Sequence, residues 1–85
     1  MIVVFTLENC PNCERLKAWL KKNNKPFLEQ DLSDTRAAEI ITMRMKGVFP
    51  NEAPAMRIGS LYFLSQYIFD AHGISEMVQK LVGDE

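Results

Sequence analysis

Two cysteines, Cys10 and Cys13, are the only thiols in the 85-residue chain, and a proline directly follows the first of them. Thiols at this spacing can hold a metal ion, form a permanent disulfide, or gain and lose a disulfide during a reaction. Tetrahedral zinc takes about four protein ligands, and the chain offers these two cysteines and one histidine, His72. One chain therefore cannot complete such a site with soft ligands alone. A metal or iron–sulfur cluster shared by two chains through Cys10 remains the alternative, although Pro11 stiffens the loop that would wrap it.

The segment before the cysteines bears on the compartment. Met1–Phe5 has no basic residue and no small-residue cleavage site, so it does not have the pattern of a secretory signal. No apolar run approaches the roughly 20 residues that span a bilayer, and no membrane partner is expected. The expected compartment is the cytoplasm. Because cytosolic thiols are kept reduced, a permanent disulfide is disfavoured and a reversible one is favoured.

Charge is balanced along the chain. Ten Lys and Arg residues and eleven Asp and Glu residues give a net charge of −1, and neither sign forms a block. A nucleic-acid surface would require a basic stripe, so this class of partner is not expected. With 47% hydrophobic residues and no repeat or linker, residues 1–85 are expected to form a single domain. We expect this domain to act as a monomer.

Two predicted elements place the cysteines. Ile2–Leu7 is a run of mostly β-branched and aromatic residues, which is typical of a strand buried on both faces. From Pro11 to about Asn24 the apolar spacing becomes helical, and proline is favoured at the first helical position because its missing N–H would be unpaired there. Cys10 is then the N-cap. It faces unpaired backbone N–H groups and the positive end of the helix dipole, and both favour a thiolate.

This placement gives the two thiols different roles. Cys10 is the predicted nucleophile, because the thiolate is the form that attacks a disulfide. Cys13 lies one turn further along the same side of the helix and is expected to be buried, so it attacks the Cys10 sulfur later and releases the product. Pro11 stiffens the short ring between the two sulfurs. Lys17, four residues beyond Cys13, either adds positive potential or is simply solvated.

The rest of the pattern predicts an α/β domain. The expected order is β-α-β-α-β-β-α, with a second strand at 27–32, a helix at 34–46, a hairpin of strands 55–58 and 61–64, and a last helix from about 74. The first βαβ unit should be parallel with a right-handed crossover. The hairpin adds an antiparallel pair, which gives a mixed four-stranded sheet flanked by helices. Residues 65–73 receive no clear assignment.

Helical spacing also predicts which side chains point inward. In the helix at 34–46, capped from Ser33–Thr35, Met43 is expected to be exposed and the inward positions are Ala37, Ile40, Ile41 and Met45. In the last helix the expected apolar positions are Ile74, Met77, Val78 and Leu81.

These elements together resemble the thioredoxin fold, and most closely its glutaredoxin branch, including the glutaredoxin-like hydrogen donors of ribonucleotide reductase. The resemblance runs through most of the chain. Val3–Thr6 leading to Cys10–Cys13 resembles the first strand and active site of that family, and Asp31–Ser33 resembles its second strand and turn. Ala53–Met56 resembles the segment whose proline the fold keeps in cis beside the active site.

The resemblance implies a thiol-disulfide oxidoreductase that needs no cofactor and cycles through a Cys10–Cys13 disulfide. Its substrates would be protein or small-molecule disulfides. It also implies a cis Pro54 against the two sulfurs and an Ala53 backbone that pairs with bound peptide or glutathione. With Pro11 and Asn12, these two residues are the expected substrate contacts.

Two departures from the glutaredoxin pattern concern the reductant. Asn12 stands where glutaredoxins usually carry an aromatic residue. Glutaredoxins also place a Gly-Gly pair and acidic residues before the last helix to receive glutathione, whereas the corresponding stretch here, Ser65–Gly73, is longer and lacks that pair. We therefore expect a flavoprotein reductase or another dithiol, rather than glutathione, to return electrons to the protein.

Overall fold

The computed structural model describes residues 1–85. Ten elements follow one another along the chain: β1 Ile2–Thr6, α1 Pro11–Lys22, β2 Leu28–Asp31, α2 Ala38–Met45, β3 Ala55–Ile58, β4 Leu61–Phe63, α3 Ser65–Ile68, β5 Phe69–Asp70, β6 Gly73–Ile74 and α4 Glu76–Gly83. The predicted helices and strands are all present, with ends that differ by a few residues. No helix combines the length and apolarity that crossing a bilayer requires.

The main sheet has four strands in the order β2-β1-β3-β4. β1 runs parallel to β2, with Val4 opposite Glu29, and antiparallel to β3, with Val4 opposite Met56. β3 and β4 form the antiparallel hairpin. The prediction of a mixed four-stranded sheet is confirmed, and it puts the strand that leads to Cys10 in the interior of the sheet.

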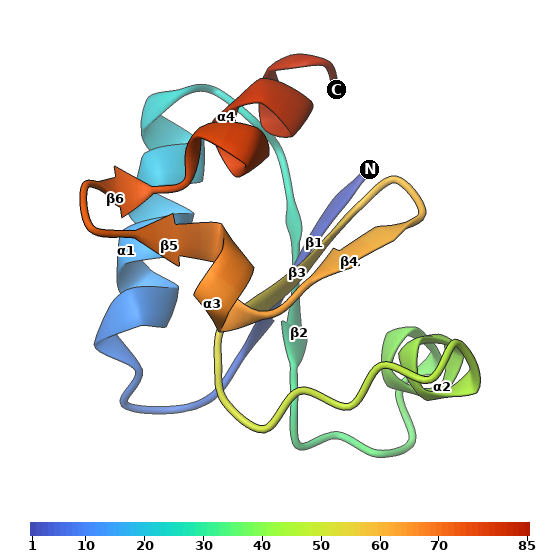
Figure 1. Cartoon of the computed structure of the whole chain (residues 1–85). Coiled ribbons are helices and arrows are strands. Elements are labelled where there is room, and N and C mark those ends of the chain that lie inside the picture. The colour runs from blue at the N-terminus through green and yellow to red at the C-terminus, as the bar shows by residue number, and fades with distance from the viewer.

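Helices cover both faces of this sheet, with α1, α3 and α4 on one side and α2 on the other (Figure 1). All five residues of β1 are buried, as its apolar run predicts. Alternate side chains point to opposite faces, so Ile2 and Val4 join one core cluster with residues of α1 and α4. Val3 and Phe5 join a second cluster with residues of α2. α1 is thus packed firmly on the sheet, with Cys10 at its first turn.

Helix α2 corrects several expectations. It begins at Ala38 rather than Asp34, and its N-cap Ala37 makes no side-chain cap. The expected inward positions Ile41 and Met45 are wrong, because their exposures are 46% and 82%, whereas Met43, expected to be exposed, is buried with Ile40. The expected cap residues were drawn from Ser33–Thr35, but Asp31 and Asp34 instead close local turns there, by accepting the N–H groups of Ser33 and Arg36.

The C-terminal part also differs. Residues 65–74 form the short helix α3 and the two-residue strands β5 and β6, none of which was assigned. Ile74 lies in β6 rather than in the last helix. α4 buries Val78 and Val82 fully, while Met77, expected inward, is 47% exposed. α3 and the β5–β6 hairpin therefore occupy the stretch between β4 and α4 for which the sequence predicts no element.

Candidate redox site

Cys10 is the N-cap of α1, as predicted, and Pro11 is the first helical residue. The backbone of Cys10 is extended, with φ −114° and ψ 98°, so its side chain turns back over the helix start. There Sγ accepts a hydrogen bond from the Cys13 N–H at 3.1 Å. The cysteine sulfur thus takes the place that a Ser or Asp oxygen occupies in an ordinary N-cap, and it meets one of the unpaired donors of the first turn.

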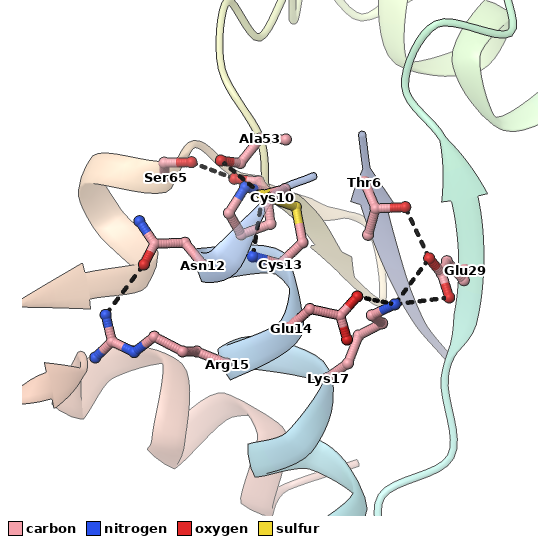
Figure 2. The surroundings of a disulfide bond; sticks show 11 residues. Thr6, Cys10, Asn12, Cys13, Glu14, Arg15, Lys17, Glu29, Ala53 and Ser65 are labelled. Carbon is pink, nitrogen blue, oxygen red and sulfur yellow. Dashed lines mark hydrogen bonds and ion pairs between the residues drawn. A yellow bond between two sulfur atoms is a disulfide. The ribbon is translucent and has the colours of Figure 1, made fainter. Parts of the chain in front are cut away.

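The two cysteines are joined by a disulfide, with 5.2 Å between their Cα atoms (Figure 2). Cys13 is 1% exposed, whereas Cys10 is only partly buried. The sulfur of Cys10 is therefore the one that a partner can reach. Cys13 is shielded by the protein, in keeping with a thiol that acts second.

The Ala53–Pro54 peptide bond is cis, and this segment lies against the disulfide (Figure 2). The Ala53 carbonyl oxygen is 3.6 Å from Cys10 Sγ. A disulfide sulfur has no proton to donate, so this is a packing contact in the oxidised protein; a reduced Cys10 thiol could donate to the same oxygen. Ser65 at the start of α3 is buried, and its hydroxyl donates to the Pro54 carbonyl. α3 thereby fixes the cis-proline segment beside Cys10.

Asn12 is exposed beside the disulfide. Its Oδ1 accepts a hydrogen bond from Arg15 Nη1 at 3.1 Å. The guanidinium of Arg15 lies 5.3 Å from the centre of the Phe69 ring, a cation–π contact. These contacts connect the turn between the two cysteines to the β5–β6 hairpin.

A group of charged side chains lies on the other side of Cys13 (Figure 2). Lys17 is 3.0 Å from a Glu14 oxygen and 3.1 Å from a Glu29 oxygen, and Glu29 also accepts the Thr6 hydroxyl at 2.9 Å. Hydrogen bonds to Glu14 and Glu29 raise the pKa of Lys17. Hydrogen bonds from Thr6 and then Lys17 lower the pKa of Glu29. Lys17 and Glu29 are thus both held charged near neutral pH.

Sequence reasoning found the thiols and the proline but missed three residues around them. Ser65 lies in the stretch that received no assignment. Thr6 and Glu29 belong to predicted strands but have no motif around them; their pairing comes from the parallel register of β1 and β2, which puts Glu29 opposite Val4, two residues before Thr6. A prediction of this register, combined with the position of Lys17 on its helix, would have placed Thr6, Glu29 and Lys17 together.

His72 lies in the exposed turn between β5 and β6, where its N–H donates to Asp70 Oδ1 at 2.8 Å.

Comparisons with known proteins agree with this geometry. Two solved structures have the same overall fold: those of the thioredoxin-like protein BC3987 (26% identity, TM-score 0.67, covering 95% of this chain and 99% of that chain) and of a mutant of it (24% identity, TM-score 0.68, covering 99% and 96%). A search of curated proteins finds no match.

The fold, a disulfide between Cys10 and Cys13 and these likenesses support a thiol redox role. A model of the family described as Glutaredoxin matches residues 2–51, more than half of the chain. The chain therefore belongs to the glutaredoxin family.

Proposed function

We propose that the protein is a dithiol oxidoreductase that reduces disulfides of proteins or small thiols through Cys10 and Cys13. One observation carries the proposal: a partly exposed cysteine sulfur receives a backbone N–H at a helix start, one turn from a buried second cysteine. The N–H and the helix dipole both favour the Cys10 thiolate over the thiol. The proposed substrate contacts are Pro11 and Asn12, which follow Cys10 in the chain, and Ala53 and Pro54, whose segment comes within 3.6 Å of Cys10 Sγ at the Ala53 carbonyl.

The cycle has two exchanges. The Cys10 thiolate attacks one sulfur of the substrate disulfide, which breaks that bond, forms a mixed disulfide with Cys10 and releases the first substrate thiolate. Cys13 then loses its proton and attacks Cys10 Sγ, which breaks the mixed disulfide and releases the second thiolate. The Cys13 proton and one proton from solvent, which replaces the proton that Cys10 lost on forming its thiolate, protonate the two released thiolates. Two electrons have passed to the substrate, and the protein is left with the disulfide of this structure.

The main chain of the half-buried residue Ala53 is suited to hold the substrate during the first exchange. Its carbonyl is already within 3.6 Å of Cys10 Sγ, so a peptide chain that runs along this segment would bring its own disulfide to that sulfur. The Ser65 hydroxyl donates a hydrogen bond to the Pro54 carbonyl and so holds this segment in place. Preorganised contacts of this kind reduce the ordering that the substrate must undergo on binding.

Electrons must then return from a reductant. The region before α4 holds the β5–β6 hairpin, and the Ser75 hydroxyl already accepts the Val78 N–H at the start of that helix. Asp70 adds a negative charge to the same hairpin. These features support a flavoprotein reductase or a small dithiol as reductant, in preference to the dicarboxylate glutathione. We propose that the protein works as a monomer in the cytoplasm.

Reduction of insulin disulfides in the presence of a small dithiol tests the proposal. The wild-type protein should accelerate precipitation of the insulin chains, and Cys10→Ser should abolish the acceleration. Ser33→Ala, an exposed position remote in sequence from the dithiol, serves as the control and should keep full activity. Retention of activity by a variant with both cysteines replaced would contradict the proposal. Iron or zinc bound through Cys10 in the purified protein would instead favour the metal-carrier alternative.

A further inference from the structure

A line of charged contacts crosses from α1 to the sheet next to the dithiol (Figure 2). Lys17 Nζ contacts Glu14 within its own helix at 3.0 Å and both oxygens of Glu29 in β2, at 3.1 and 3.3 Å. Thr6, the last residue of β1, donates its hydroxyl to Glu29. Glu29 therefore accepts hydrogen bonds from Thr6 at the end of β1 and from Lys17 in α1, the two elements on either side of the segment that carries Cys10.

The position of Lys17 on α1 brings this group near the sulfurs. Residues four apart in a helix lie on the same face, with about 5–6 Å between their Cβ atoms, so Lys17 follows Cys13 by one turn on the face that meets the sheet. Thr6 begins the connection that leads to Cys10 four residues later. An open depression of about 500 Å³ lies at this place, lined by Thr6, Leu7, Glu8, Asn9, Glu14, Lys17, Glu29 and Asp31.

In this group the Lys17 side chain is less exposed to solvent than the two carboxylates. The Lys17 side chain is 15% exposed, whereas those of Glu14 and Glu29 are 74% and 45% exposed. An ammonium one turn from Cys13 stabilises a thiolate at the dithiol, and the carboxylates that hold it offset part of that effect. The group as a whole carries a charge of −1. Removing one member changes the local charge in a direction that depends on which member is removed.

We propose that Glu29 is a positioning residue that, through Lys17, sets how readily the dithiol ionises. Glu29 holds the Lys17 ammonium against β2 and neutralises it, so the thiolate is favoured less than a free ammonium would favour it. The inference rests on the proposed dithiol function and adds a residue that neither the cysteine motif nor the family match points to. Because a stabilised thiolate stabilises the reduced protein, the same pair also sets the reduction potential.

Other charged groups face this region and stay constant in the test. Glu8 and Asp31 line the same depression, and Lys21 on α1 acts on Glu29 from one turn beyond Lys17. Arg15 on α1 points away, toward Asn12 and Phe69. In the segment before Pro54 the charged residue is Glu52, which is exposed.

Three variants and a control test the proposal. Glu29→Gln leaves Lys17 with one carboxylate fewer, so the pKa of the Cys10 thiol should fall by about half a unit and the reduction potential should become less negative. Lys17→Met leaves two carboxylates uncompensated, so both quantities should move the opposite way by a similar amount. The double variant, Glu29→Gln with Lys17→Met, restores the net charge of −1 to the group, so its Cys10 thiol should titrate close to that of the wild type.

The control is Glu39→Gln, which removes a carboxylate from another ion pair between a helix and a strand, that of Glu39 in α2 with Arg57 in β3. It should leave the Cys10 titration unchanged. The measurement is the rate of iodoacetamide alkylation of the reduced proteins against pH, with each potential read from equilibrium with a dithiol buffer. Thermal melts establish that each variant is folded.

The outcomes separate the two proposals. Shifts of opposite sign in the single variants and their cancellation in the double variant support the role of Glu29. Shifts of the same sign, or none, in proteins whose Cys10 still reacts as a low-pKa thiol would overturn it and leave the dithiol function standing. A wild-type Cys10 that titrates like a free cysteine would instead remove the helix-start argument on which the proposed function rests, and loss of insulin reduction would overturn that function itself.

Discussion

The backbone N–H of Cys13 donates a hydrogen bond to Sγ of Cys10, with 3.1 Å between nitrogen and sulfur. The bond runs from the residue that is buried to the residue that is partly exposed. In the reduced protein the same N–H would meet a sulfur that can carry a full negative charge, and hydrogen bonds to a charged acceptor are about twice as strong as neutral ones. The helix start is therefore expected to favour the anion of Cys10 over that of the buried Cys13.

Selective alkylation should reveal this asymmetry. In the reduced protein, iodoacetamide at neutral pH should label Cys10 at least ten times faster than Cys13, because Cys10 is reachable and favours the thiolate. The labelled site is read by peptide mass spectrometry over a time course. Equal rates at the two positions would contradict the assignment of roles.

The buried hydroxyl of Ser65 should matter for stability. Ser65→Ala removes the donor to the Pro54 carbonyl, and an unpaired buried acceptor costs about 1–3 kcal/mol of unfolding free energy. Urea unfolding measures the change. Ser33→Ala, which removes an exposed hydroxyl bonded to Asp31, should change stability by less than about 0.5 kcal/mol. Similar losses in the two variants would contradict the structural role of Ser65.

Acid should weaken the contribution of Glu29 to stability. Its pKa is lowered in the folded protein by Thr6 and Lys17, so the unfolded chain binds its proton first as the pH falls. The contribution is fully present above the ordinary value of 4.5 and is lost as the pH drops through the folded value. The difference in unfolding free energy between wild type and Glu29→Gln, below about 1 kcal/mol for so exposed a pair, should shrink from pH 6 to about pH 3. A difference that grows on acidification would contradict the lowered pKa.

Coupled assays should distinguish the reductants. At equal reducing equivalents, a thioredoxin-reductase-type flavoprotein or a small dithiol should turn the protein over at least several times faster than glutathione with glutathione reductase. The physical reason is the β5–β6 hairpin, whose carboxylate Asp70 opposes a dicarboxylate near the start of α4. NADPH consumption measures turnover with the flavoprotein and with the glutathione–glutathione reductase system. Brisk turnover with glutathione and none with the flavoprotein would reverse this expectation.

How much the sequence could predict depends on the length of each element. β1 and α1 have long, regular patterns, and Pro11 marks the helix start, so the position of Cys10 could be read directly. α3, β5 and β6 have four, two and two residues, which is too short for any periodicity to show. Their existence depends on contacts such as that of Arg15 with Phe69.

The error in α2 has a different cause. In α2, Ile40 with Met43 and Ile41 with Met45 form two apolar stripes of nearly equal strength, and helical spacing alone does not choose between them. Tertiary packing on Val3 and Phe5 selects Ile40 and Met43. Glu29 could not be singled out either, because its exposed edge strand has no apolar alternation and its partners come from β1 and α1.

The most direct measurement of the central claim is capture of the mixed disulfide. Reduced Cys13→Ser protein, mixed with a substrate disulfide, should stop after the first exchange and carry one substrate half bound to Cys10, which intact and peptide mass spectrometry identify. The matched Cys10→Ser protein should form at most a trace of adduct, because Cys13 is buried. An adduct found mainly on Cys13, or none on Cys10 at neutral pH, would contradict the account of Cys10 as the nucleophile.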